Sequence, residues 1–179
     1  MGAEAIAQNG KEIALPACLF LDSYGGNFAE YIEAVYQAFR KDFVLTRPVF
    51  RGKALRLKRF PITSGWEATF YHLTHEGSDE QNRTPCFRRC ERISWLKPLI
   101  EQCDALNLKV WPQIRKGKKR ICIWLELANE PDHLIILDDR EEYLLPWTAY
   151  PITYANQKRK KQKEYEEYLQ EVKKQGPPN

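Results

Sequence analysis

The sequence predicts an α+β fold, in which one or more N-terminal helices pack on a curved, mostly antiparallel sheet that ends in a meander, followed by a charged C-terminal helix. Three patterns support this prediction. Residues 27–43 carry a single apolar stripe at helical spacing. Residues 118–127, 132–137 and 142–152 are strand-like runs joined by short polar turns, as in an antiparallel meander. Residues 154–175 are highly charged, with a narrow apolar stripe typical of a docked helix.

Both predicted helices are defined by their apolar stripes. The first stripe consists of Phe28, Tyr31, Ile32, Val35 and Phe39. Asn27 can cap this helix, and Glu30 three residues later supports the cap. The second stripe consists of Tyr165, Tyr168, Leu169 and Val172. We therefore expect each helix to bury one face against the domain.

The remaining elements follow from turn signals and composition. Residues 1–12 are expected to be a frayed terminus, and residues 49–60 a basic strand or an irregular basic hairpin. The β-rich run "EATFYHLTH" (67–75) is predicted to be a strand. Pro98 predicts a short helix with the proline in its first turn, and Pro146 places the last strand at an edge or a bulge. The sheet is expected to have roughly four to six strands.

Length and composition bound the class of protein. The 179 residues fit one core, with an N-terminal extension and helix (1–45), an α+β core (46–153) and a charged helix and tail (154–179). With 43% apolar and 29% charged residues, the chain matches neither disordered nor membrane proteins, and we expect a cytoplasmic protein. Its five cysteines are irregularly spaced, so reduced thiols are expected.

The charge distribution indicates a polyanionic partner. The formal net charge is only +4, but basic residues gather in segments 40–59, 109–120 and 158–163, whereas acidic residues gather in 126–142. Phosphate neutralisation needs several cations on one face, so nucleic acid is a candidate ligand. Solubilising surface charge is the alternative explanation.

The histidines suggest a metal-free acid/base site. In a strand, His72 and His75 would face opposite sides, so only one of them could enter a given cleft. Thr148 and Tyr150 share one face of the last predicted strand. An imidazole beside hydroxyl and guanidinium groups has the components needed to cleave RNA. The structural alternative is a core histidine and a simply packed Thr–Tyr pair.

Two other chemistries use the cysteines. His72, His75, Cys86 and Cys90 are zinc-ligand types, but their spacing does not match a tight zinc knuckle. Cys90 lies among arginines that would lower its thiol pKa, yet no histidine is adjacent in sequence. Phosphate-binding loops, dinucleotide motifs, serine-hydrolase elbows and paired-aspartate metal motifs do not occur. We expect no metal or other cofactor.

The order "ATFYHLTHEGSDEQNRTP", "RCERISW" and "LDDREEYLLPWTAYP" resembles proteins of phages and other mobile elements in the barnase, EndoU, colicin and RelE superfamily of metal-independent RNases. The similarity covers residues 50–165. It implies helices packed on a curved antiparallel sheet whose concave face holds RNA. It also implies the residues that form the catalytic site, namely His72, Arg89, Arg92, Thr148 and Tyr150.

The leading prediction is a toxin-like endoribonuclease with His72 as acid or base. A non-catalytic nucleic-acid-binding or regulatory module and a protein-interaction domain remain as alternatives. The residues expected to bind RNA are Arg51, Lys53, Arg56, Lys58, Trp95, Lys116, Lys118 and Lys119. RNA is the expected partner, with a cognate antitoxin or inhibitor as a second candidate that could bind the acidic segment 126–142.

Overall fold

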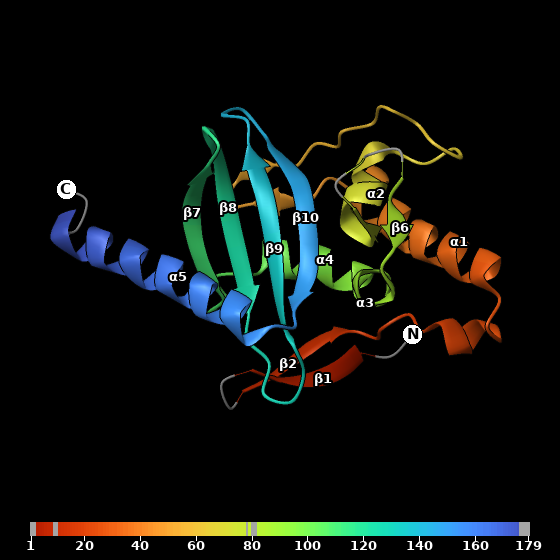
Figure 1. Cartoon of the computed structure of the whole chain (residues 1–179), viewed down its shortest axis with the longest axis horizontal. Coiled ribbons are helices and arrows are strands. Elements are labelled where there is room, and N and C mark those ends of the chain that lie inside the picture. The colour runs from red at the N-terminus through yellow and green to blue at the C-terminus, as the bar shows by residue number, and fades with distance from the viewer. Residues whose placement is uncertain (1–2, 9–10, 78, 80–81, 176–179) are drawn as a thin grey trace.

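The centre of the molecule is a four-stranded antiparallel meander (Figure 1). The computed structural model describes residues 3–8, 11–77, 79 and 82–175. Within them, the sheet has the spatial order β10-β9-β8-β7. Its strands are β7 (Lys109–Arg115), β8 (Lys118–Leu125), β9 (Asp132–Asp139) and β10 (Leu144–Ile152). The predicted α+β fold and its terminal meander are therefore confirmed.

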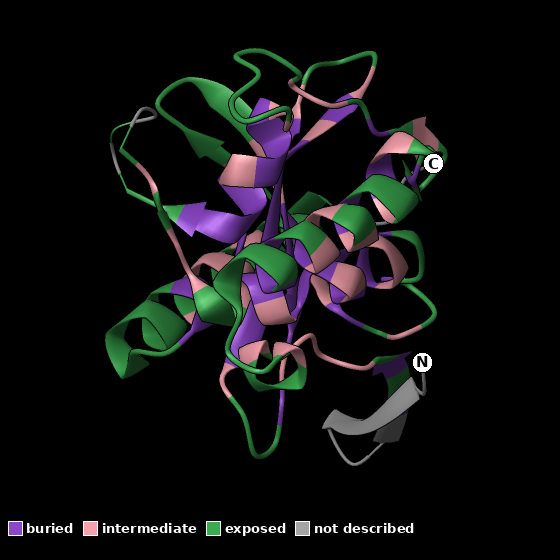
Figure 2. Cartoon of the chain, turned by 90° about the vertical axis from the view of Figure 1, so that its right-hand side faces the viewer, coloured by how far each residue is buried: buried purple, intermediate pink, exposed green. Residues whose placement is uncertain are grey.

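The helices that precede the sheet cover one of its faces. They are α1 (Phe28–Phe39), α2 (Ala68–Thr74), α3 (Phe87–Glu91) and α4 (Leu96–Glu101). Tyr31 and Val35 of α1 belong to the same hydrophobic core as Ile123 of β8 and Ile135 of β9. The buried residues accordingly run through the centre of the molecule in Figure 2. Pro98 lies in the first turn of α4, as predicted.

Helix α1 follows its sequence pattern closely. The Asn27 side chain accepts hydrogen bonds from the backbone N–H groups of Ala29 and Glu30, at 3.1 and 3.4 Å. Phe28, at the start of the predicted stripe, is instead 41% exposed. Three short helical turns complete this layer: the 3₁₀ helices η1 (Leu21–Tyr24) and η3 (Ile93–Trp95) and the π-helical turn η2 (Arg40–Val44).

The opposite face of the sheet is covered only in part, by α5 (Ala155–Gln175). Tyr165 and Tyr168 of this helix pack against a second core. That core consists of Trp111, Cys122, Trp124, Leu134, Ile136 and Ile152. Leu169 and Val172, also in the predicted stripe, are 37% and 44% exposed, so α5 docks through its earlier turns. None of the helices in the described residues has the length and apolar character needed to cross a membrane.

The prediction of a frayed N-terminus was wrong. Strands β1 (Ala3–Gln8) and β2 (Lys11–Pro16) form an antiparallel hairpin. The sequence signal was Asn9-Gly10 between two alternating segments, which favours a tight hairpin turn. Residues 1–2 and 9–10 lie outside the described residues.

The run at residues 67–75 is not a strand but the helix α2. Every residue of α2 except Tyr71 is buried, so the segment shows no one-sided helical pattern. Its threonines and aromatic residues have high strand propensity, which tertiary packing overrides here. Beyond the helix, β5 (His75–Glu76) pairs with β6 (Thr84–Pro85). The predicted opposition of His72 and His75, which depended on a strand, was therefore also wrong.

Two further basic segments take strand form. β3 (Val49–Phe50) and β4 (Lys53–Ala54) make a short hairpin, which agrees with the irregular basic hairpin of the sequence prediction. β7 was not predicted, because residues 109–120 were treated only as a basic segment. Pro112 interrupts the strand pattern there, and an edge strand such as β7 tolerates a proline.

Strand β10 is both an edge and a bulged strand, as Pro146 predicted. Its register with β9 shifts between Pro146 and Thr148. In a regular strand, Trp147 and Thr148 would face opposite sides. The bulge brings both residues to the same end of the sheet face, beside α2 and α3.

Candidate functional site

A pocket of about 190 Å³ lies where α2 and α3 meet the bulge of β10. Its lining includes His72, His75, Arg83, Arg89, Trp147 and Thr148. It therefore brings together two imidazoles, two guanidinium groups, an indole and a hydroxyl from segments distant in sequence. Of the predicted catalytic residues, His72, Arg89 and Thr148 meet here.

His72 lies on α2 and packs against the indole of Trp147. The two ring centroids are 4.9 Å apart, and the His72 residue is 6% exposed. Two cations also approach the Trp147 ring: Arg120 Cζ and Lys118 Nζ lie 5.0 and 5.7 Å from its centroid. Such cation–π contacts hold positive charge close to the pocket. Of the predicted RNA-binding lysines, Lys118 thus comes close to this site.

Arg89 of α3 connects the pocket to the sheet. Its Nη1 donates to the backbone oxygen of His75 at 3.0 Å and to Thr148 Oγ1 at 3.4 Å. Its guanidinium carbon also lies 5.7 Å from the centroid of the Tyr150 ring. These contacts fix a guanidinium group beside the hydroxyl of Thr148. Because Thr148 accepts from Arg89, its own hydroxyl hydrogen remains to donate to another group.

His75 is held as a neutral imidazole in this pocket. Burial, followed by the charges of Arg83 and Arg89, lowers the pKa of His75 from 6.5 to about 4. The hydroxyl of Thr74 donates to the Phe70 carbonyl at 2.6 Å, and His75 Nδ1 lies 2.8 Å from the same hydroxyl oxygen. Since that hydroxyl has one hydrogen, Nδ1–H of His75 is the donor to it. The other nitrogen, Nε2, therefore carries a lone pair.

Two further cavities continue from this pocket along β10. The first, of about 440 Å³, is lined in part by Arg88, Arg89 and Tyr150. The second, of about 260 Å³, is lined in part by Tyr150, Arg115 and Lys160. Arg89 lines the pocket and the first cavity, and Tyr150 lines both cavities. The three spaces form a row between β10, α3 and the start of α5, which we call the β10 groove.

The β10 groove carries excess positive charge. Arg88 and Lys160 are exposed, and neither they nor Arg115 forms a salt bridge with a carboxylate of the described residues. Tyr150, also a predicted catalytic residue, lies farther along the groove and does not line the pocket of His72. Burial raises the pKa of the Tyr150 hydroxyl, so it stays protonated. The groove therefore offers a row of donors without negative charge at Tyr150.

Two predicted site residues lie in the core instead. Trp95 is 1% exposed and donates from Nε1 to the Pro16 carbonyl at 2.8 Å, so it has no free face for a base. Arg92 pairs with Glu91 and Glu130 at 2.9 and 2.8 Å and packs over the Trp95 ring. Both residues join η3 to neighbouring elements and line none of the three spaces of the groove.

The other predicted RNA-binding residues do not line the groove. Arg51 pairs with Asp104 at 2.6 Å, and Lys53 pairs with Asp139 at 2.6 Å. Arg56 lies over the Tyr143 ring, and the backbone of Lys58 exchanges hydrogen bonds with the hydroxyl of Thr69. Lys116 and Lys119 are exposed near the β7–β8 turn. The sequence-adjacent basic residues are thus distributed over several surfaces.

The acidic segment 126–142 is largely neutralised within the chain. Asp138 lies 3.5 Å from Arg120 and 2.8 Å from Arg140. The other pairs are Glu126 with Lys109, Glu130 with Arg92, Asp132 with Lys158, and Asp139 with Lys53. Five of the seven carboxylates of this segment are thus paired within the chain, whereas Glu141 and Glu142 are exposed, and binding of a basic partner by the segment stays a prediction.

The structure also bears on the two alternatives that use cysteines, a nucleophilic thiol and a zinc site. Burial raises the pKa of Cys90 to about 12, and its Sγ lies 3.5 Å from the Thr74 carbonyl. This is opposite to the low pKa that a nucleophilic thiolate needs. Over residues 3–8, 11–77, 79 and 82–175, no three His, Cys, Asp or Glu residues are grouped as metal ligands.

Sequence reasoning missed Arg83, Arg88 and Trp147 as members of the site, and it placed His75 on the side away from His72. A helical assignment of residues 67–75 would have placed His72 and His75 on one side, since they are three residues apart. Trp147 could not be found this way, because its orientation depends on the bulge. Comparisons with protein-family models, with curated proteins and with solved structures find no significant match to this chain. The superfamily resemblance therefore stays a prediction.

Proposed function

We propose that the protein binds single-stranded RNA along the β10 groove and cleaves it without a metal ion. The observation that carries this proposal is the pocket in which His72, Arg89 and Thr148 lie together at one end of a basic groove. A proton-transfer group, a fixed cation and a hydroxyl donor are the functional groups that metal-free phosphodiester cleavage requires.

In the proposed reaction, His72 takes the proton of the ribose 2′-hydroxyl. The 2′-oxygen forms a bond to phosphorus, the bond between phosphorus and the 5′-oxygen breaks, and water donates a proton to the leaving oxygen, while His72 returns its proton to the solvent. The products are a 2′,3′-cyclic phosphate and a 5′-hydroxyl end. Arg89 and Thr148 donate to the phosphate oxygens as charge gathers on them. His75 Nε2, neutral at pH 7, offers a second proton acceptor.

The form of the groove favours a polymer over a mononucleotide. Thr148, Tyr150 and Ile152 lie at alternate positions of β10 and line successive parts of the groove. At a strand rise of about 3.3 Å per residue, these positions span about 13 Å. Arg88, beside Tyr150, supplies a cation between the two ends of this path. Cations spaced along such a groove can contact successive phosphates.

The direct test is cleavage of a mixed RNA pool in EDTA, with detection of 2′,3′-cyclic phosphate ends. We expect cleavage to persist in EDTA and to fall at least about 100-fold in His72→Gln, as general acid/base catalysis contributes roughly 10²–10⁴-fold. Arg89→Ala should lose a similar factor. Its matched control is Arg51→Ala, which removes an exposed pair with Asp104 outside the groove and should leave the rate unchanged.

A non-catalytic RNA-binding module is the second candidate. The low exposure of His72 and its packing on Trp147 favour this alternative, because a structural histidine would show the same features. This alternative predicts that no cyclic-phosphate ends form with the parent or with His72→Gln, and that the substitution changes RNA affinity by no more than a small factor. The proposed reaction would be contradicted if EDTA abolished cleavage, or if the protein cleaved none of the RNAs offered to it.

A further inference from the structure

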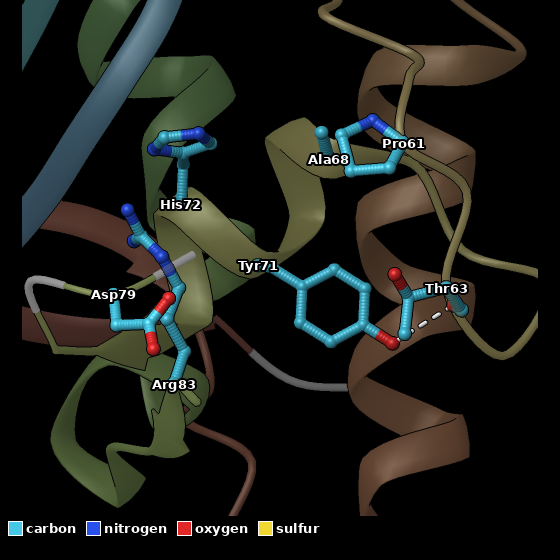
Figure 3. Close-up of a pocket in the computed structure, with 7 residues that line it drawn as sticks. All are labelled: Pro61, Thr63, Ala68, Tyr71, His72, Asp79 and Arg83. Atoms are coloured by element: carbon cyan, nitrogen blue, oxygen red, sulfur yellow. Dashed lines mark hydrogen bonds between the residues drawn. The ribbon is translucent and has the colours of Figure 1, made fainter. Parts of the chain in front are cut away.

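A further cavity, larger than the pocket of His72, adjoins that pocket and shares His72 and Arg83 with it (Figure 3). It measures about 490 Å³, within the roughly 300–1,000 Å³ typical of small-ligand sites. Ala68, Tyr71 and His72 form one wall, since they lie three and four residues apart on α2. Pro61 and Thr63 lie on one side of this wall, and Asp79 and Arg83 lie on the other.

We propose that this cavity holds one unpaired nucleobase of the RNA whose phosphate enters the pocket of His72, and so determines which base flanks the cleavage site. The inference rests on the proposed function. His72 and Arg83 line both spaces, so a ligand in one lies directly beside a ligand in the other. A nucleobase attached to the reacting nucleotide is the group that would enter.

The chemistry of the walls suits a nucleobase. Tyr71 extends from α2 toward Thr63, and its ring lines the cavity, where it can stack on a base (Figure 3). The Tyr71 hydroxyl is occupied, because it donates to the Thr63 backbone oxygen at 2.8 Å. Arg83, half-buried, forms no salt bridge with a described carboxylate, so its guanidinium can donate to ring acceptors. Flat aromatic and guanidinium groups together recognise single-stranded bases.

The loop that carries Pro61 and Thr63 is held against α2 by hydrogen bonds to its backbone, which do not involve the side chain of Thr63. Thr63 and Trp66 exchange backbone hydrogen bonds at 3.1 and 2.9 Å, and Tyr71 bonds to the Thr63 backbone oxygen. A larger side chain at Thr63 would therefore fill the cavity and keep these bonds. The neighbouring Ile62 is 54% exposed and does not line the cavity. Thr63→Trp and Ile62→Trp thus form a matched pair, one blocking the cavity and one leaving it open.

The test uses the four ribonucleosides, which lack phosphate, with the full chain observed by amide NMR. We expect at least one nucleoside to shift the resonances of Ala68 and Tyr71. Its affinity should fall roughly 10-fold or more in Thr63→Trp and stay unchanged in Ile62→Trp. In RNA cleavage, the base preference beside the cut should weaken in Thr63→Trp and persist in Ile62→Trp. Circular dichroism checks that both variants fold.

The two proposals fail in different ways. Nucleoside shifts that disappear in Thr63→Trp, in a protein that cuts no RNA, would refute cleavage and support the base site. RNA cleavage with the same base profile in both variants, and no nucleoside shift at Ala68 or Tyr71, would refute the base site and support cleavage.

Discussion

Replacing His133 by leucine should remove a large part of the acid sensitivity of the fold. His133 lies in β9 and is 1% exposed, with its ring edge-on to Trp95 and 6.0 Å between the ring centroids. Neither of its ring nitrogens has a hydrogen-bond partner within the described part of the chain. Burial, followed by the charges of Arg92 and Arg89, lowers the pKa of His133 from 6.5 to about 3.

The sign and size of the effect follow from proton linkage. Between pH 6.5 and 3, the unfolded chain binds a proton at His133 that the folded chain does not bind. The free energy of unfolding is therefore highest above pH 6.5 and falls as the pH is lowered. One pKa unit corresponds to about 1.4 kcal/mol, so lowering the pH from 7.5 to 5 should cost about 2 kcal/mol through His133 alone.

Denaturant unfolding at pH 7.5 and pH 5 measures this contribution. In His133→Leu, the loss of unfolding free energy between the two values should be smaller than in the parent by about 2 kcal/mol. At pH 7.5 the variant should be at least as stable, since two buried nitrogens without partners are removed. Ile135→Val, on the same strand, should lower stability by about 1 kcal/mol equally at both pH values. An unchanged pH dependence in His133→Leu would refute the reasoning.

Three more predictions concern binding, stability and reactivity. Reversing Arg115 and Lys160 to Glu should make the slope of log RNA affinity against log salt concentration less steep by about 1.4, at roughly 0.7 per lost single-strand contact. Lys119→Glu, outside the groove, should leave this slope unchanged. Equal slopes in all variants would place the RNA elsewhere. Asn27→Ala removes the cap of α1 and should lower the free energy of unfolding by about 1 kcal/mol in a urea titration, whereas no loss would mean that the cap is dispensable. Cys90, with a pKa near 12, should resist iodoacetamide in the folded protein at pH 8 and react after denaturation, and rapid labelling of the folded chain would contradict its burial.

Helix α1 and the last three strands of the meander could be predicted from the sequence, for different reasons. Helix α1 buries one stripe of its side chains, so its helical period identifies it. Strands β8 to β10 were identified as short apolar runs between polar turns, and β9 is buried on both faces over all but its last residue. Helix α2 could not be found this way, because it is buried on nearly all sides and is rich in strand-forming residues. Periodicity is informative only where one face of an element remains in water.

The candidate site was partly predictable for a related reason. Arg89 and Thr148 meet in the structure, 3.4 Å apart, although 59 positions separate them in the chain. Arg92 was expected in the site from the superfamily resemblance and Trp95 as an RNA-binding residue, yet the turn from α3 into η3 directs both into the core. The contribution of Trp147 depends on the register shift of β10, which no local pattern encodes. Residue types indicated the chemistry, and only the packing decided which members take part.

The outer edge of β7 has a consequence for how copies of the chain behave when concentrated. Within the described residues, no strand pairs with this side of β7, so its backbone could template the addition of a strand from another molecule. Pro112 lacks an N–H group in the middle of that edge, and the exposed Arg115 places a positive charge near one end, whereas Lys109 at the other end is paired with Glu126. Two copies meeting edge to edge would therefore lose a ladder hydrogen bond at Pro112. The proline that interrupts the strand pattern of β7 in the sequence thus also makes the free edge of β7 a poorer template for a strand from another molecule.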